Sequence, residues 1–233
     1  CSSTTPTSVH THGLIVGANL PTHGDDQYGD SVFVLTFNAR NGVVRRPPSM
    51  PVAFNFNATQ YEVQLPDDHP RGLFWFHPHA HALAFGQVGS GMAGMISVGD
   101  DTAVLAKRHH HHHHVPDVRH LILRDVQVLG DGRTPLRESD PDFCSHDSGV
   151  PRDGMCIGSG EGRRADLNYT DGRWAYLVNG RVAPHVRVHA SRGELWRVLT
   201  AAASATLALQ VYSEKRREAL SVQVLELNGV AVS

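Results

Sequence analysis

Three histidines at alternate positions end an apolar, aromatic stretch, residues 72–81, which reads GLFWFHPHAH. Side chains two residues apart along a β-strand project from the same face. If the stretch is one strand, His77, His79 and His81 line one surface, with neighbouring imidazoles about 7 Å apart, which is two strand rises. One strand can therefore offer several neutral nitrogen ligands to a single metal site.

A second pair of histidines with the same spacing, His10 and His12, lies upstream in the sequence HTHG. Two such strands side by side would bring four imidazoles together, and imidazole suits copper, zinc, iron and nickel, with copper(II) first in the affinity order. A lone histidine in a strand is usually an ordinary core or surface residue. Two pairs in these contexts favour metal ligation by His10, His12, His77 and His79, whereas His81 is either a supporting imidazole or merely a neighbour.

The two histidine motifs resemble those of the multicopper oxidases, the family of laccases, ascorbate oxidase and bacterial copper oxidases. That family carries His-x-His-Gly near the start of its first cupredoxin domain, and an aromatic-aromatic-His-x-His run later in the same domain. Five further segments are similar to the family: 29–33 (GDSVF), 68–72 (DHPRG), 89–96 (GSGMAGMI), 177–180 (LVNG) and 193–198 (GELWRV). The resemblance spans most of the chain and is most specific at the histidines.

The resemblance implies a role for each motif histidine. His10 would bind the type 2 copper, and His12, His77 and His79 would bind the type 3 copper pair. Asp30 matches a position where the family often has an acid near the trinuclear cluster, which implies proton delivery as dioxygen is reduced. The alternative interpretation of Asp30 is an ordinary turn aspartate after a glycine.

The family's third domain supplies four more cluster histidines and a His-Cys-His run that holds the type 1 copper. The three cysteines here, Cys1, Cys144 and Cys156, are not flanked by histidines, and no further histidine motif follows residue 189. We therefore expect a fragment or shortened relative of an oxidase, truncated at both ends. It would supply half of the cluster ligands to an enzyme that couples one-electron substrate oxidation to reduction of dioxygen to water, and would be inactive alone.

Two other functions remain open. The chain could be a copper-binding cupredoxin-like protein without oxidase activity. It could also be a zinc-dependent hydrolase, since His-x-His pairs occur in hydrolytic zinc sites. Such enzymes usually add a carboxylate beside the histidines, whereas Pro78 and Ala80 occupy the intervening positions here.

Composition limits the partners. A chain of 233 residues suits one or two domains. The formal net charge of −2 argues against nucleic acid or an anionic membrane as the main partner. No apolar run approaches the ~20 residues of a transmembrane helix, and no signal peptide is visible. The resemblance implies dioxygen and an unidentified reducing substrate as partners of the intact protein, and a secreted or periplasmic location.

Short strand candidates separated by turn residues predict an all-β sandwich or barrel. The resemblance specifies a cupredoxin-like Greek-key β-sandwich, with one nearly complete domain and part of a second. The predicted first domain is 1–100, truncated at its amino terminus, and the predicted partial second domain is 173–233. Strands are predicted in the first domain at 32–37, 52–56, 61–65, 73–81 and 94–98.

Residues 101–172 are predicted to be a linker and insertion, with one strand at 118–128. Six consecutive histidines, 109–114, favour a flexible, solvated linker over a defined metal site, because a homopolymer has no fixed geometry. Cys144 and Cys156 bracket a loop-like stretch and are either a disulfide, in an oxidising compartment, or two free thiols.

The second domain is predicted to contain strands at 174–178, 186–189 and 195–200 and a hairpin of 206–212 with 220–227. The charged segment 214–218 would be the solvated turn of that hairpin rather than a nucleic-acid patch. His185 and His189 have no motif partner, so we expect them to be structural or surface residues.

Overall fold

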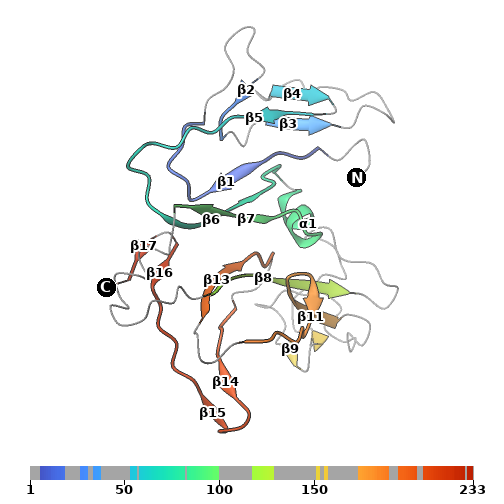
Figure 1. Cartoon of the computed structure of the whole chain (residues 1–233). Helices are drawn as coiled ribbons and strands as arrows, with labels where there is room; N and C mark the ends of the chain where they lie inside the picture. The colour runs from blue at the N-terminus through green and yellow to red at the C-terminus, as the bar shows by residue number, and fades with distance from the viewer. Residues whose placement is uncertain are drawn as a thin grey trace.

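The structure is a computed structural model that describes residues 6–18, 27–30, 34–37, 53–56, 58–81, 83–99, 117–128, 151–152, 155–156, 173–188, 194–203, 207–228 and 230–232. Within these residues the chain is mostly β-strand with one short helix (Figure 1). The all-β prediction is confirmed for the described residues, and the cupredoxin-like arrangement stays a prediction. No helix among the described residues is long and apolar enough to cross a membrane. The six-histidine tract, Cys144 and His189 lie outside the described residues.

The two histidine motifs belong to one antiparallel sheet with the strand order β1-β6-β7. Its strands are β1 (His10–His12), β6 (Gly72–His77) and β7 (Gly94–Val98). Phe74 of β6 is buried, and its ring lies against Gly13, directly after β1. Because Gly13 has a φ of +87° and its Cβ would approach the Phe74 ring at 3.2 Å, a larger residue would be strained there.

Four short strands form two parallel pairs beside this sheet. The pairs are β3 (Val34–Phe37) with β4 (Ala53–Phe56), and β2 (Gln27–Tyr28) with β5 (Gln60–Tyr61). Figure 1 places both pairs on the opposite side of β1 from the helix. The expected strand at 61–65 is wrong beyond Tyr61: residues 62–65 are mostly exposed and lead into Pro66, so no buried face selects a partner.

A short helix, α1 (Ala84–Gly89), follows the histidine strand and was not predicted. It begins where the carbonyl oxygen of Ala80 accepts the N–H groups of both Leu83 and Ala84. The glycine content of this segment is unfavourable for a helix. Burial of Gln87 and Val88 offsets this unfavourable helix propensity. Because that burial depends on tertiary contacts, the local sequence does not predict the helix.

A larger sheet joins strands of the predicted linker, 101–172, to strands of the predicted second domain, 173–233. Its strand order is β13-β8-β11-β10-β9, and β12 adds beside β11. Its strands are β8 (Asp117–Val128), β9 (Pro151–Arg152), β10 (Met155–Cys156), β11 (Arg173–Val178), β12 (Arg181–Val182) and β13 (Glu194–Thr200). Strand β8 buries alternate side chains, Leu121, Leu123, Asp125 and Gln127. The strands predicted at 118–128, 174–178 and 195–200 are confirmed.

The structure corrects the remaining predictions for the second domain. Residues 186–188 form no strand; Val186 and Val188 are exposed, so their alternation lacks a partner strand. The predicted hairpin turn is confirmed at 214–217, whereas Glu218 already belongs to a strand. The strands of this hairpin are only β14 (Tyr212–Ser213) and β15 (Glu218–Ala219). Residues further on pair separately, as β16 (Glu226–Leu227) with β17 (Val230–Ala231).

Two side chains connect the first sheet and α1 to the later part of the chain. Arg124 of β8 donates to the carbonyl oxygens of Val88 and Gly89 at 3.0 and 2.6 Å, at the end of α1. Glu226 of β16 accepts the Leu73 N–H of β6 at 3.0 Å. The histidine strand is therefore bonded to a residue 153 positions away in the sequence. The domain boundaries near 100 and 173 stay predictions.

Candidate metal centre

The two histidine motifs face each other across one strand pair. Strands β1 and β6 align antiparallel, with His10 opposite His77 and His12 opposite Trp75. Residues directly opposite in such a pair project from the same face of the sheet. His10, His12, His77 and Trp75 therefore share one face, although 65 positions separate His12 from His77. The sequence-based expectation that the two segments lie side by side is met.

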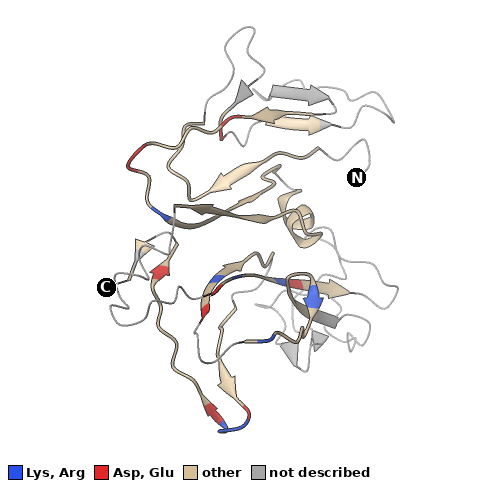
Figure 2. Cartoon of the chain, in the orientation of Figure 1, with Lys and Arg blue, Asp and Glu red and all other residues tan. Residues whose placement is uncertain are grey.

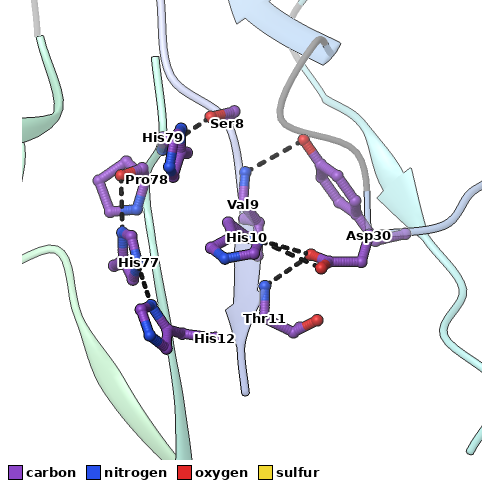
Figure 3. A network of polar contacts seen from close by, with 10 residues as sticks. Ser8, Val9, His10, Thr11, His12, Asp30, His77, Pro78 and His79 are labelled. Carbon is purple, nitrogen blue, oxygen red and sulfur yellow. Dashed lines mark hydrogen bonds and ion pairs between the residues drawn. The ribbon is translucent and has the colours of Figure 1, made fainter. Parts of the chain in front are cut away.

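Three of the predicted ligands form a compact group. The ligand nitrogens of His10, His12 and His77 lie within 4.8 Å of one another. The closest approach is 3.2 Å, between His12 Nδ1 and His77 Nε2 (Figure 3). Two imidazoles bound to one ion at about 2.0–2.1 Å would hold their nitrogens roughly 2.9–3.4 Å apart. The His12–His77 distance already fits that range, and His10 requires only a small closure.

His79 joins the cluster from outside the strand. Strand β6 ends at His77, because Pro78 has no N–H for a ladder hydrogen bond. The prediction of one strand through residue 81 is therefore wrong. The His79 ring nevertheless lies 5.2 Å from the His10 ring and 5.8 Å from the His77 ring, measured between centroids. The Nδ1 atom of His79 is buried and has no hydrogen-bond partner among the described residues.

His81 occupies a different position from the other histidines. It is exposed in the turn that follows β6, and its ring lies 5.6 Å from that of His79. Since the strand has already ended, the alternation that would have placed His81 beside His77 does not apply. His81 is a neighbour of His79 and is not part of the compact three-histidine group.

Asp30 orients His10. Both carboxylate oxygens lie 3.1 Å from His10 Nδ1, and Oδ1 also accepts the Thr11 N–H at 2.7 Å. A carboxylate can only accept, so the proton of His10 sits on Nδ1 and the Nε2 lone pair is left for a metal. Carboxylates commonly orient metal-binding histidines in this way. Asp30 is thus more than a turn residue, while its role in proton delivery stays a prediction.

The surroundings of His77 and His12 favour the neutral imidazole, which can bind a metal. The Pro78 carbonyl oxygen accepts a hydrogen bond from His77 Nδ1 at 3.0 Å, which directs the Nε2 lone pair towards His12. Partial burial lowers the pKa of His77 and neighbouring imidazoles lower it further, while the hydrogen bond to the Pro78 carbonyl oxygen acts in the opposite direction. Partial burial also lowers the pKa of His12, with His10 and His79 adding to the effect. Neutral imidazole is the form that binds metal.

Trp75 covers the imidazoles from the same face of the sheet. Its ring centroid lies 4.2 Å from that of His77 and 4.9 Å from that of His12, with interplanar angles of 31° and 32°. This tilted stacking limits rotation of both imidazoles. Trp75 is therefore placed to report on the site through its fluorescence.

Three supporting residues were not singled out from the sequence. Ser8 accepts the His79 N–H at 2.9 Å, and the Tyr61 hydroxyl accepts the Val9 N–H at 3.2 Å. His69 is buried; its Nε2 accepts the Ile15 N–H at 2.9 Å and its Nδ1 donates to the adjacent Pro70 carbonyl oxygen at 2.7 Å. For Ser8 and Tyr61 no sequence signal exists. For His69 the only signal is its place in the segment 68–72.

The donor set fits a metal that prefers imidazole, such as copper or zinc. Three nitrogens already converge, two imidazoles have their other nitrogen engaged by an oxygen acceptor, and a buried nitrogen of His79 lacks a partner among the described residues. These four histidines are the residues that would hold such an ion.

No family model matches the chain, and no curated protein matches it. Among solved structures it is similar to a multi-copper oxidase from Pseudomonas thermotolerans, with 18% sequence identity and a TM-score of 0.42. The match covers 86% of this chain and 34% of that one, so the chain spans about a third of the length of that oxidase.

Proposed function

We propose that this chain is the copper-binding portion of a multicopper oxidase and supplies half of a trinuclear copper cluster. His10 would bind the type 2 copper, and His12, His77 and His79 the type 3 pair, as the sequence motifs imply. The observation that carries the proposal is the convergence of His10, His12 and His77 within 4.8 Å. When bound, copper would supply the one-electron chemistry that couples oxidation of a reducing substrate to reduction of dioxygen to water.

The chain's own residues prepare the site for binding. Asp30 keeps the proton of His10 on Nδ1, and the Pro78 carbonyl oxygen does the same for His77. In the metal-free protein, His12 donates the proton on its Nδ1 to His77 Nε2 across their 3.2 Å contact. Metal binding at His12 Nδ1 would move that proton to His12 Nε2, and affinity should rise with pH only where the imidazoles must first lose the proton of their charged form.

No charged residue on the three strands of the first sheet competes with Asp30 for His10. The strands that carry the imidazoles, β1 and β6, contain no Lys, Arg, Asp or Glu, and neither does β7. Figure 2 shows these three strands without charged residues. The carboxylate of Asp30 therefore acts on His10 without a competing charge from the sheet itself.

The test is a copper(II) titration followed by electron paramagnetic resonance. The six-histidine tract 109–114 would bind copper by itself, so the titration uses a chain in which Gly and Ser replace the tract. We expect copper bound by several imidazole nitrogens, with quenching of Trp75 fluorescence. A matched variant, His185→Ala, removes an exposed histidine outside the cluster and should bind like the parent chain.

Two results would contradict the proposal. One is copper binding that survives when His10, His12 and His77 are all replaced by alanine. The other is a chain that takes up only zinc and hydrolyses an ester or a lactam, which would favour the zinc hydrolase instead.

A further inference from the structure

His79 is the only one of the four cluster histidines that lies outside a strand. The ladder hydrogen bonds of β1 and β6 fix the backbones of the other three. The ladder ends at Pro78, and the His79 ring contributes no hydrogen bond through Nδ1 among the described residues. Another contact must therefore set the position of His79 beside His10.

That contact is the hydroxyl of Ser8. Its Oγ accepts the backbone N–H of His79 at 2.9 Å, across 71 positions of sequence (Figure 3). Ser8 is only 2% exposed, so water cannot readily replace its hydroxyl as the acceptor. Because Ser8 lies two residues before His10, the bond ties the second motif directly to the first.

The two residues before Ser8 are held in place by a buried glutamine on α1, Gln87. Gln87 Nε2 donates to the Pro6 carbonyl oxygen at 2.7 Å, and the Thr7 hydroxyl donates to Gln87 Oε1 at 3.3 Å. Thr7 also exchanges two backbone hydrogen bonds with Thr36 of β3, at 2.8 and 3.0 Å. The segment 6–8 is thus fixed from two sides before it reaches the cluster.

These contacts close a loop of interactions around His79. The chain runs from His79 to Ala80, whose carbonyl oxygen begins the hydrogen bonding of α1, and α1 carries Gln87 back to Pro6. We infer that Ser8, held by Gln87, is a positioning residue that keeps the His79 imidazole in the cluster. The consequence for metal binding rests on the proposed function; the consequence for the position of His79 does not.

The first experiment uses the metal-free chain, so it does not depend on copper. Nuclear Overhauser effects are measured between ring protons of His10 and His79, whose centroids are 5.2 Å apart, and of His12 and His77, at 5.4 Å. Ser8→Ala should remove the first effect and keep the second. Ser8→Thr restores a hydroxyl and should recover the first, and Ser221→Ala, at an exposed serine, should change neither.

Retention of the His10–His79 effect in Ser8→Ala would overturn the inference. If Ser8→Ala does not fold, Gln87→Glu decides instead, because it keeps the acceptor for Thr7 and removes the donor to Pro6. Weakening of the His10–His79 effect with an unchanged His12–His77 effect supports the inference. An unchanged pair of effects in Gln87→Glu would contradict it.

The second experiment measures copper(II) affinity in the background without the six-histidine tract. Residues that support metal ligands typically change affinity by about 10–100-fold. We expect Ser8→Ala to lose about tenfold, with one imidazole fewer in the resonance spectrum, and Ser8→Thr to recover both. An unchanged imidazole count in Ser8→Ala would contradict the inference. Failure of the parent chain to bind copper would refute the proposed function, while the proton measurements would still decide the place of His79.

Discussion

The two main sheets of the molecule are held together by different means. In the β1-β6-β7 sheet, strand β1 is three residues long, and its outer edge is bonded by side chains from distant segments, Tyr61 to Val9 and Asp30 to Thr11. In the larger sheet, β8 is twelve residues long and pairs on both sides, with β11 and β13. The first sheet is organised by specific polar contacts around imidazoles, and the second by backbone pairing and burial.

Charge follows the same division. The strands of the first sheet carry no charged residues (Figure 2). The larger sheet contains the ion pair of Arg119 with Glu194, at 2.6 and 2.7 Å. Trp196 Nε1 donates to the same carboxylate at 2.8 Å. The hydrogen bond to Glu194 is the main cause of the raised pKa of Arg119. In the larger sheet, an ion pair therefore connects β8 to β13. In the first sheet, the imidazoles are the titratable side chains of the strands.

If this division is correct, the largest effect on metal binding comes from the first sheet. Replacing both His10 and His77 by alanine removes two of three converging nitrogens, so copper affinity should fall by more than about 100-fold, beyond the range of supporting residues. The affinity is measured by isothermal titration calorimetry, with the chain in which Gly and Ser replace the six-histidine tract. The control His185→Ala should leave copper affinity unchanged. Equal losses of affinity in both variants would show that the metal site is not confined to the first sheet.

The largest effect on folding should come from the second sheet. Leu123 is buried in β8, so Leu123→Ala should lower the free energy of unfolding by about 2–5 kcal/mol. Copper affinity of the folded protein should not change. Urea unfolding without metal measures the loss, and Val182→Ala, at an exposed position of β12, should cost about 0.5 kcal/mol or less. A change of copper affinity in Leu123→Ala would show that the two sheets are coupled.

A smaller effect on the site is expected from Asp30→Asn. The amide can still accept the Thr11 N–H, but it removes the negative charge that holds the proton of His10 on Nδ1. Copper affinity should fall by about 10–100-fold. The matched control is Asp67→Asn, at an exposed turn aspartate. If both asparagine variants bind copper like the parent chain, Asp30 does not orient the ligand.

The smallest expected effect is on pH dependence. Burial lowers the pKa values of His12 and His77 below 6.5, so around and below that pH the unfolded chain binds more protons than the folded one. This contribution to stability is fully present above pH 6.5 and is lost as the pH falls towards the folded pKa values. Urea unfolding of metal-free protein at pH 7.5 and 5.5 measures it. Replacing both histidines by alanine should reduce the pH dependence, and an identical dependence would contradict the assignment.

The sequence predicted the all-β class and most long strands because alternation of apolar residues is a local signal. Strand β8 shows this well, since the buried Leu121 and Leu123 alternate with the less buried Ile122 and Arg124. The prediction failed where alternation had no partner, as at Val186 and Val188, and where tertiary contacts stabilised a poor helix, as in α1. It also failed at Pro78. The histidine spacing predicted a strand through residue 81, but Pro78 has no N–H for the ladder, and the strand ends at His77.

The sequence alone determined which imidazoles could share a face: the spacing of His10 with His12, together with the aromatic run before His77, defines two extended segments with ligands on one side. Only the tertiary structure decided how those ligands are held. Asp30 reaches His10 over 20 positions, and Ser8 reaches His79 over 71. Hydrogen bonds between such distant residues leave no periodic trace in a sequence, because they depend on where the whole chain brings each polar group.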